Sequence, residues 1–167
     1  MCYLINIMDN IIEEIKNWII NFVEIKAPIF GNMPVCPFAK KERINNKINY
    51  IITDLSNLDN IVEKINQNNF DEKSTLILID THNKISLKEK ECFEEEINRM
   101  CNTNWSVYCL ANEDLNVDGF FTRTNKYPII IVTLLTEVEK AEKGLWNTKY
   151  FSNWSEHNYK RLKVDKP

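Results

Sequence analysis

Residues 47–80, KINYIITDLSNLDNIVEKINQNNFDEKSTLILID, contain the pattern that decides the fold. Two runs rich in β-branched residues, 47–54 and 75–80, indicate strands. Between them, apolar side chains over 58–65 repeat at the spacing of a short helix. Residues 76–79 are apolar without interruption, which is typical of a central strand buried on both faces. A strand, a helix and a second strand in this order predict a parallel pair.

The segments that follow extend this alternation. Ser86 and Glu89 form a capping box that opens a helix to about Met100. Residues 105–111 and 129–135 then predict two further strands, separated by a polar loop. Because these two strands follow each other without an intervening helix, we expect them to form an antiparallel pair.

A second capping box, Thr136 with Glu139, opens a last helix that ends before Gly144. We therefore expect an α/β protein: a single-domain sandwich with a mixed sheet of about four strands and helices on its faces. A thioredoxin-like and a ferredoxin-like sandwich both fit this element order. The pattern does not give the order of the strands within the sheet.

The two ends of the chain differ in character. Residues 8–25 place apolar side chains on one face of an amphipathic helix, which we expect to be capped by Asp9 and to end before Pro28. Residues 145–167 form a tail that is rich in aromatic and basic side chains and shows no clear period. We expect both segments to belong to one domain over residues 1–167.

Composition excludes several classes of function. With three glycines, the chain contains neither glycine-rich loop that cradles phosphates. Five cysteines without a C-x-x-C pair and two histidines argue against a metal site, and no cofactor is expected. The N-terminal residues lack a basic secretory region, so we expect a cytoplasmic protein that is not bound to a membrane. Heavy use of Asn, Ile and Lys is typical of an AT-rich genome.

Cys36 is the strongest candidate for chemistry. Pro37 is favoured at the first position of a helix, which would make Cys36 the N-cap. The helix dipole and Lys40 would then favour a reactive thiolate. The alternative is a buried cysteine that packs as a small apolar residue.

Asp80 ends the central strand, and Asp54 ends the strand before it. If these strands are parallel, both carboxylates lie at the edge where α/β sheets bind ligands. The two carboxylates would then bind a metal or act as general acid and base, with Asp80 as the catalytic residue and His82 beside it as a ligand-binding imidazole. The alternative is that both aspartates form Asx turns or helix caps.

A further candidate group precedes the last strand. Arg123 lies among hydroxyl-bearing and amide side chains in a loop, a setting that suits recognition of a carboxylate or phosphate. Tyr127 precedes Pro128, so its backbone is expected to be extended. The alternative is that Arg123 pairs with a surface acid.

Three stretches together resemble an uncharacterised bacterial family, domain of unknown function 1415. They are Cys36-Pro37-Phe38-Ala39-Lys40, the strand at Thr75–Leu78, and Arg123–Pro128 followed by an apolar strand. Only the first is matched tightly. The family's histidines after the third strand and within the last strand are absent here. The resemblance implies an α/β fold and groups Cys36 with Arg123 and Tyr127.

From the sequence we therefore expect a small protein that binds or transforms a small anionic ligand. Cys36 and Asp80 would be catalytic, and Lys40, Arg123, Tyr127 and His82 would bind the ligand. The alternative is a non-catalytic module that uses the N-terminal helix or the aromatic tail to bind a protein partner or a second copy. Binding of single-stranded nucleic acid by the tail is disfavoured, because the rest of the chain is acidic.

Overall fold

The computed structural model describes residues 2–81, 87–100, 104–110, 116–121 and 126–161. Its centre is a four-stranded sheet with the order β3-β4-β8-β5. The parallel pair is formed by β3 and β4, and β8 runs antiparallel to both β4 and β5. These strands are β3 (Ile48–Ile52), β4 (Thr75–Ile79), β5 (Trp105–Leu110) and β8 (Ile129–Leu134). The mixed sheet, its parallel pair and its antiparallel pair are confirmed.

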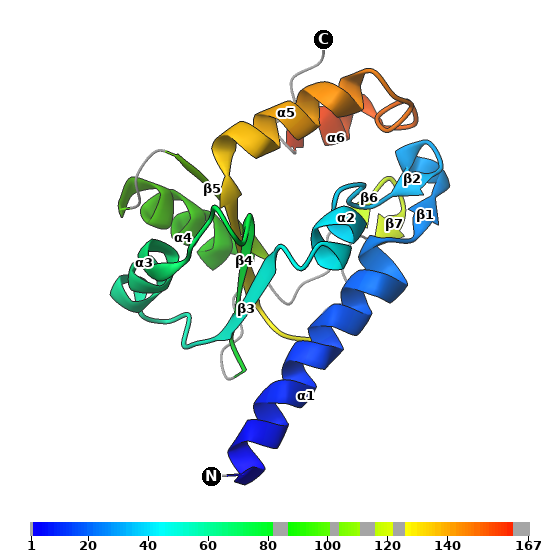
Figure 1. The fold of residues 1–167 in the computed structure, drawn as a ribbon. Helices are drawn as coiled ribbons and strands as arrows, with labels where there is room; N and C mark the ends of the chain where they lie inside the picture. Colours follow the sequence, from blue (N-terminus) through cyan, green and yellow to red (C-terminus); the bar gives the residue numbers. More distant parts are fainter. Residues whose placement is uncertain (1, 82–86, 101–103, 111–115, 122–125, 162–167) are drawn as a thin grey trace.

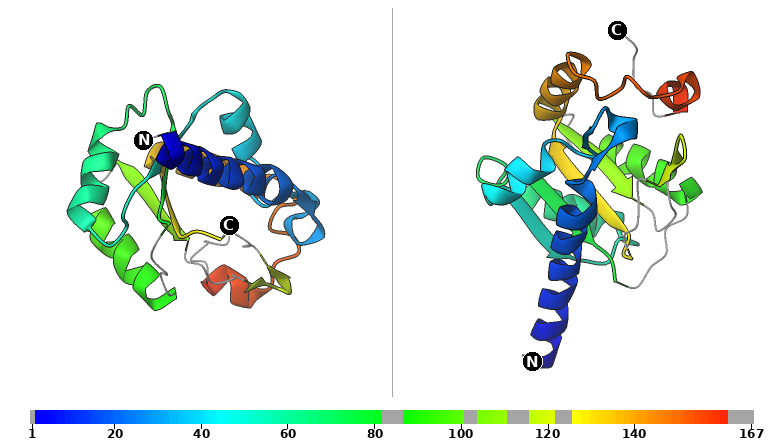
Figure 2. Two further views of the ribbon diagram at one scale, coloured as in Figure 1. Left: turned by 90° about the horizontal axis from the view of Figure 1, so that it is seen from below. Right: turned by 90° about the vertical axis from the view of Figure 1, so that its right-hand side faces the viewer.

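Helices cover both faces of this sheet, as Figures 1 and 2 show. One face carries α3 (Leu58–Gln67) and α4 (Leu87–Met100). The other carries α1 (Cys2–Trp18), which continues as a π-helical turn, η1 (Ile19–Val23). Along β4, Leu76 and Leu78 pack on the α3 and α4 side, while Ile77 and Ile79 pack on the α1 side. The unbroken apolar run therefore fills two cores, as the sequence predicts.

The remaining elements gather around one end of the sheet. They are short, except for the helix α5 that leaves β8 (Figure 1). They comprise β1 (Lys26–Ala27), η2 (Pro28–Phe30), β2 (Met33–Pro34), α2 (Ala39–Ile44), β6 (Asn116–Val117), β7 (Phe120–Phe121), α5 (Leu135–Trp146) and α6 (Glu156–Arg161). The segment expected to be a polar loop before β8 thus contains a two-stranded hairpin, and the tail contains a helix.

The aromatic side chains of the tail form a third core with η2. Tyr150 and Phe151 are buried there against Phe30, and Trp146, Trp154 and Tyr159 pack around them. The backbones also approach closely, since a Cβ placed on Gly31 would lie 2.0 Å from the Lys149 carbonyl oxygen. The described part of the tail, residues 145–161, therefore packs against η2 through its aromatic residues.

Several helix boundaries differ from those expected. The first helix begins at Cys2, so Asp9 lies inside it and does not cap it. Helix α5, the last helix that the sequence predicts, begins at Leu135 without a side-chain cap and runs through Gly144 to Trp146. The capping box expected at Thr136 is therefore wrong, because Thr136 is already within the helix. Ser86, expected to cap α4, lies outside the described residues.

The strand order also answers the question that the sequence left open. A ferredoxin-like sandwich has the chain order β-α-β-β-α-β, whereas the four main strands here follow β-α-β-α-β-β. A thioredoxin-like sandwich places the first strand of its parallel pair inside the sheet, whereas β3 lies at the edge. Neither arrangement is found.

Candidate functional site

Four of the six predicted site residues lie in the described structure: Cys36, Lys40, Asp80 and Tyr127. His82 and Arg123 lie outside the described residues, so their predicted roles stay predictions. The four described residues are distributed over both ends of the sheet.

Cys36 lies in a turn before α2 and is not the N-cap of a helix. The helix begins at Ala39, with Phe38 in the capping position, and has only six residues. Cys36 is instead held by tertiary contacts: its backbone N–H donates to the Val23 carbonyl at 3.2 Å. The side chain is partly buried and packs against the core beneath α1.

The electrostatics of this thiol are opposite to those expected. Burial raises the pKa of Cys36 above its ordinary value, and the nearby carboxylates of Glu42 and Glu24 raise it further. The backbone N–H groups of Phe38 and Ala39 lower the pKa, but by less than burial raises it. A short helix contributes a weak dipole, so desolvation dominates. Burial therefore favours the protonated thiol over the thiolate.

Lys40 is exposed on α2, and its positive charge acts on the carboxylate of Glu24. The pKa of Glu24 is lowered chiefly by its hydrogen bond with Arg43, with a smaller contribution from the charge of Lys40. Arg43 Nε lies 2.6 Å from Glu24 Oε1, and Nη2 lies 2.9 Å from Oε2. This bidentate pair ties α2 to the end of η1. The carboxylate of Glu24 thus pairs with Arg43 and partly offsets the charge of Lys40.

Asp80 is buried, with 1% of its surface exposed, and has a structural contact. Its Oδ2 accepts a hydrogen bond at 3.1 Å from the backbone N–H of Leu55, in the loop between β3 and α3. Asp54 forms an Asx turn, because Oδ1 accepts the Ser56 N–H at 2.8 Å. The carboxylates do lie at the predicted edge, and both hold the loop that follows β3.

Tyr127 is half-buried against the α1 side of the sheet. The Lys126 ammonium lies 5.1 Å from the centre of its ring and 3.6 Å from Glu14 Oε2 of α1. Pro128 follows, and its carbonyl accepts the Asp80 N–H at 3.1 Å. Tyr127 and Asp80 therefore lie at the same end of the sheet, where β4 ends and β8 begins.

Cys36 and Lys40 belong to the opposite end. The Ser74 hydroxyl, just before β4, donates to the carboxylate of Glu42 in α2. An extended chain rises about 3.3 Å per residue, so Ser74 and Asp80 lie about 20 Å apart along β4. One small ligand cannot contact residues at both ends. The structure thus brings Cys36 together with Lys40, and Asp80 together with Tyr127, but does not join the two pairs.

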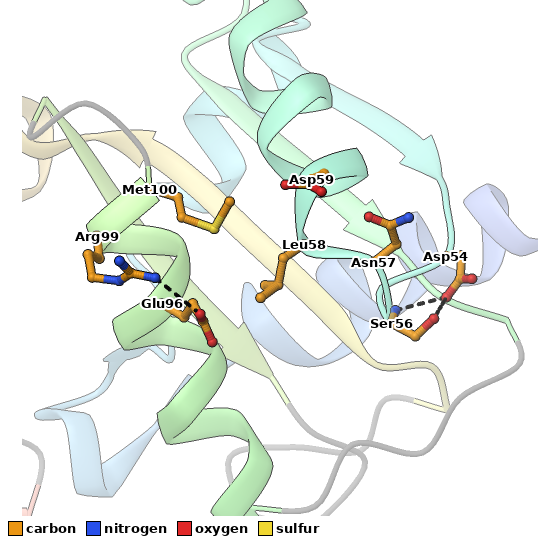
Figure 3. A pocket seen from close by; sticks show the side chains of 8 residues that line it. All are labelled: Asp54, Ser56, Asn57, Leu58, Asp59, Glu96, Arg99 and Met100. Atoms are coloured by element: carbon orange, nitrogen blue, oxygen red, sulfur yellow. Dashed lines mark hydrogen bonds and ion pairs between the residues drawn. The ribbon is translucent and has the colours of Figure 1, made fainter.

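An open groove of about 780 Å³ lies between the start of α3 and the end of α4 (Figure 3). Three carboxylates and one guanidinium line it, and the guanidinium of Arg99 is paired with Glu96 at 3.2 Å. The lining residues are Asp54, Ser56, Asn57, Leu58, Asp59, Glu96, Arg99 and Met100. This charge balance is unfavourable for a small anion. Within the described ranges, no group of three acidic, histidine or cysteine side chains is placed to hold a metal ion.

The apolar side chains along α1 differ in exposure, a difference that the sequence pattern does not predict. Ile15 and Ile19 are buried against the sheet, with 0% and 3% exposed. Ile7 and Met8 continue the same apolar stripe, yet they are 43% and 44% exposed. Figures 1 and 2 show why: the first turns of α1 extend past the sheet. No described helix is both long and apolar enough to cross a bilayer.

Comparisons with protein-family models, with curated proteins and with solved structures found no match to this chain. The resemblance to domain of unknown function 1415 therefore stays a prediction.

Proposed function

We propose that this protein is a non-catalytic interaction module that binds a protein partner through the projecting end of α1. The projecting end is defined here as residues 2–10. The observation that carries the proposal is the exposure of Ile7 and Met8 on a stripe whose later members Ile11, Ile15 and Ile19 are buried. A helix that extends past its own sheet presents apolar surface that another surface can cover.

The sequence of the projecting end suits one mode of recognition. Leu4, Ile7 and Met8 occupy positions i, i+3 and i+4, the spacing by which a helix anchors in an apolar groove. The helix continues into the part that packs on the sheet, so binding does not have to order it first.

The distribution of the other candidate residues supports this choice over a small-anion site. The raised pKa of Cys36 disfavours the thiolate that catalysis would need, and the carboxylates of Glu24 and of the groove disfavour binding of an anion. Arg123 and His82 lie outside the described residues, and the small-anion hypothesis stays untested. The aromatic tail is packed against η2 and is not the proposed binding surface.

The proposal is tested by photocrosslinking in cells from two positions of the same helix. A photoreactive amino acid replaces Met8 on the apolar stripe or Asn10 on the polar face. We expect a discrete adduct with another protein from position 8 and none from position 10. The captured protein is then purified and titrated with the full chain by calorimetry.

Matched substitutions separate this contact from general charge effects. Met8→Asp and Asn10→Asp add the same charge to exposed positions on one helix. Full burial of a methionine contributes about 1.5–3 kcal/mol, so Met8→Asp should weaken binding at least about 10-fold. Asn10→Asp should leave it within about twofold. Equal adducts from both positions, or equal affinities of the two variants, would exclude this surface.

A further inference from the structure

The edge of the sheet at β3 carries an unused set of backbone groups. Thr75 N–H donates to the Lys47 carbonyl, and Thr53 N–H donates to the Ile79 carbonyl. Together with the register of the parallel pair, these bonds show that the backbone N–H and C=O groups of the odd-numbered residues of β3 point toward β4. The N–H and C=O groups of Ile48, Tyr50 and Ile52 therefore point away from the sheet. Among the described residues, no hydrogen bond uses them.

The composition of β3 leaves this edge open to pairing. Its sequence, INYII, contains no charged residue and no proline, and its ladder with β4 is unbroken by a bulge. Charges, prolines and bulges are the usual devices that prevent edge-to-edge pairing. Ile48 is 8% exposed and residues 49–52 are partly exposed, whereas residues 76–79 of β4 are at most 3% exposed. In Figure 1, β3 is the strand nearest the viewer, and no helix is drawn in front of it.

We propose that β3 pairs antiparallel with β3 of a second copy, so that two four-stranded sheets join into one. With Tyr50 opposite Tyr50 of the second copy, Ile48 lies opposite the other copy's Ile52. All three outward-facing residues then form hydrogen-bonded pairs, and the N–H and C=O groups of both strands are satisfied in six bonds. No other register of two identical strands uses the complete set in both copies.

The side chains of this register also fit a second copy. The isoleucines at positions 48 and 52 form β-branched cross-strand pairs, and Tyr50 forms an aromatic pair across the two-fold axis. Because Ile48–Ile52 carries no charge, the symmetric pairing brings no like charges together. This pairing does not use Ile7 or Met8, so it is independent of the proposed function.

The first test is sedimentation equilibrium of the full chain over about 5–500 µM, in the range where pairing of short strands is measurable. Ile52→Pro removes an outward N–H that the monomer does not use, and Ile52→Val keeps this N–H with a side chain of similar volume. We expect a wild-type dimer, Ile52→Val within about threefold of its dissociation constant, and Ile52→Pro weakened at least about 30-fold. Circular dichroism verifies that each variant is folded.

Amide hydrogen exchange of the wild type provides a second test that needs no variant. The amides of residues 49, 51 and 53 should be protected at every concentration, because they bond to β4. Those of residues 48, 50 and 52 should become protected only as concentration rises.

A chain that stays monomeric throughout the range overturns the inference. So does a dimer that Ile52→Pro leaves intact. A dimer that Met8→Asp dissociates and Ile52→Pro does not would place self-association on α1 instead. Concentration-independent exchange at residues 48, 50 and 52 would likewise contradict pairing through β3. The crosslinking result for α1 remains separate from each of these outcomes.

Discussion

The two edges of the sheet are built differently. The Leu135 N–H donates to the Asn104 carbonyl, which fixes the hydrogen-bond pattern between β5 and β8. In this pattern the backbone N–H and C=O groups of the odd-numbered residues of β5 point away from the sheet. The outward N–H of Cys109 donates to Glu94 Oε1 at 2.7 Å, so a side chain of α4 closes this position. On β3, the equivalent groups have no such cover among the described residues.

The two edges therefore differ at one position: a side chain of α4 accepts the Cys109 N–H of β5, whereas no described group accepts an outward N–H of β3. A carboxylate that accepts an edge N–H prevents an incoming strand from using it. The acid is supplied by the helix that packs on the same face, so protection of β5 is coupled to packing of α4. The connection that follows β3 is held by Asp80 and Asp54, which bond to the loop and leave the strand edge unused.

The largest expected effect comes from removing the cover of β5. Glu94→Ala leaves the N–H of Cys109, a residue only 1% exposed, without this charged acceptor. The loss of such a hydrogen bond costs about 2–3 kcal/mol. We expect the free energy of unfolding, measured by urea denaturation, to fall by this amount.

Glu94→Gln is the matched control because it keeps an oxygen acceptor at the same position. It should lose about 1 kcal/mol or less. If both variants unfold with the same free energy as the wild type, Glu94 does not protect this edge. An equal, large loss in both would show that its negative charge matters and the hydrogen bond does not.

The second effect concerns Tyr50 on the unprotected edge. Its hydroxyl is buried and has no hydrogen-bond partner in the part of the chain that the structure describes. Burial raises the pKa of Tyr50 to about 12, although the charge of Arg43 opposes the shift. The unfolded chain releases this proton near pH 10. The folded state favours the neutral phenol, so the free energy of unfolding should fall as pH rises from about 10 to about 12.

Tyr50→Phe isolates this titration from all others. At pH 7 the variant should be as stable as the wild type or slightly more stable, because no described hydrogen bond is lost. Between pH 9 and pH 12 the wild type should lose about 1–2 kcal/mol more than the variant. Parallel curves of unfolding free energy against pH would contradict the raised pKa. A large loss at pH 7 would show that the hydroxyl has a partner.

The sequence predicts structural features that depend on neighbouring residues better than features that depend on residues far apart in the chain. The strands 48–52 and 75–79 are predicted because their β-branched and apolar runs are local signals. Their edge or central positions are not predicted, except that the unbroken apolar run of β4 indicates burial on both faces. The strand order arises from contacts among segments separated by tens of residues, which no local pattern encodes.

The candidate site was predicted less well, for the same reason. Asp80 lies at the expected edge, but its contact with the Leu55 N–H could not be inferred from its own neighbours. Glu94 belongs to an acid-rich helix that is most simply interpreted as a solvated face, yet it bonds to a strand 15 residues away. The Glu24–Arg43 pair spans 19 residues and has no spacing signal.

Cys36 shows how a correct motif can lead to an incorrect electrostatic conclusion. Cysteine before proline suggests a helix N-terminus, and such a position lowers a thiol pKa. Here the backbone of Cys36 bonds to Val23, the helix starts three residues later, and the side chain packs under α1. Tertiary burial therefore outweighs the local dipole.

The smallest expected effect is a difference in rate between two thiols on opposite faces of the sheet. Cys109 is 1% exposed on the α4 side, and Cys36 is partly buried on the α1 side. The labelling is done at pH 7.5, about one unit below the pKa of a free thiol. We expect Cys36 to be alkylated more slowly than a free thiol, and Cys109 to be alkylated more slowly than Cys36. Mass spectrometry of peptides after timed labelling measures both rates, with the urea-unfolded chain as the reference.

Because access to Cys109 requires opening of β5, Glu94→Ala should accelerate the labelling of Cys109 and leave the labelling of Cys36 unchanged. Rapid, selective labelling of folded Cys36 would instead indicate a thiolate, and would return the small-anion hypothesis to first place.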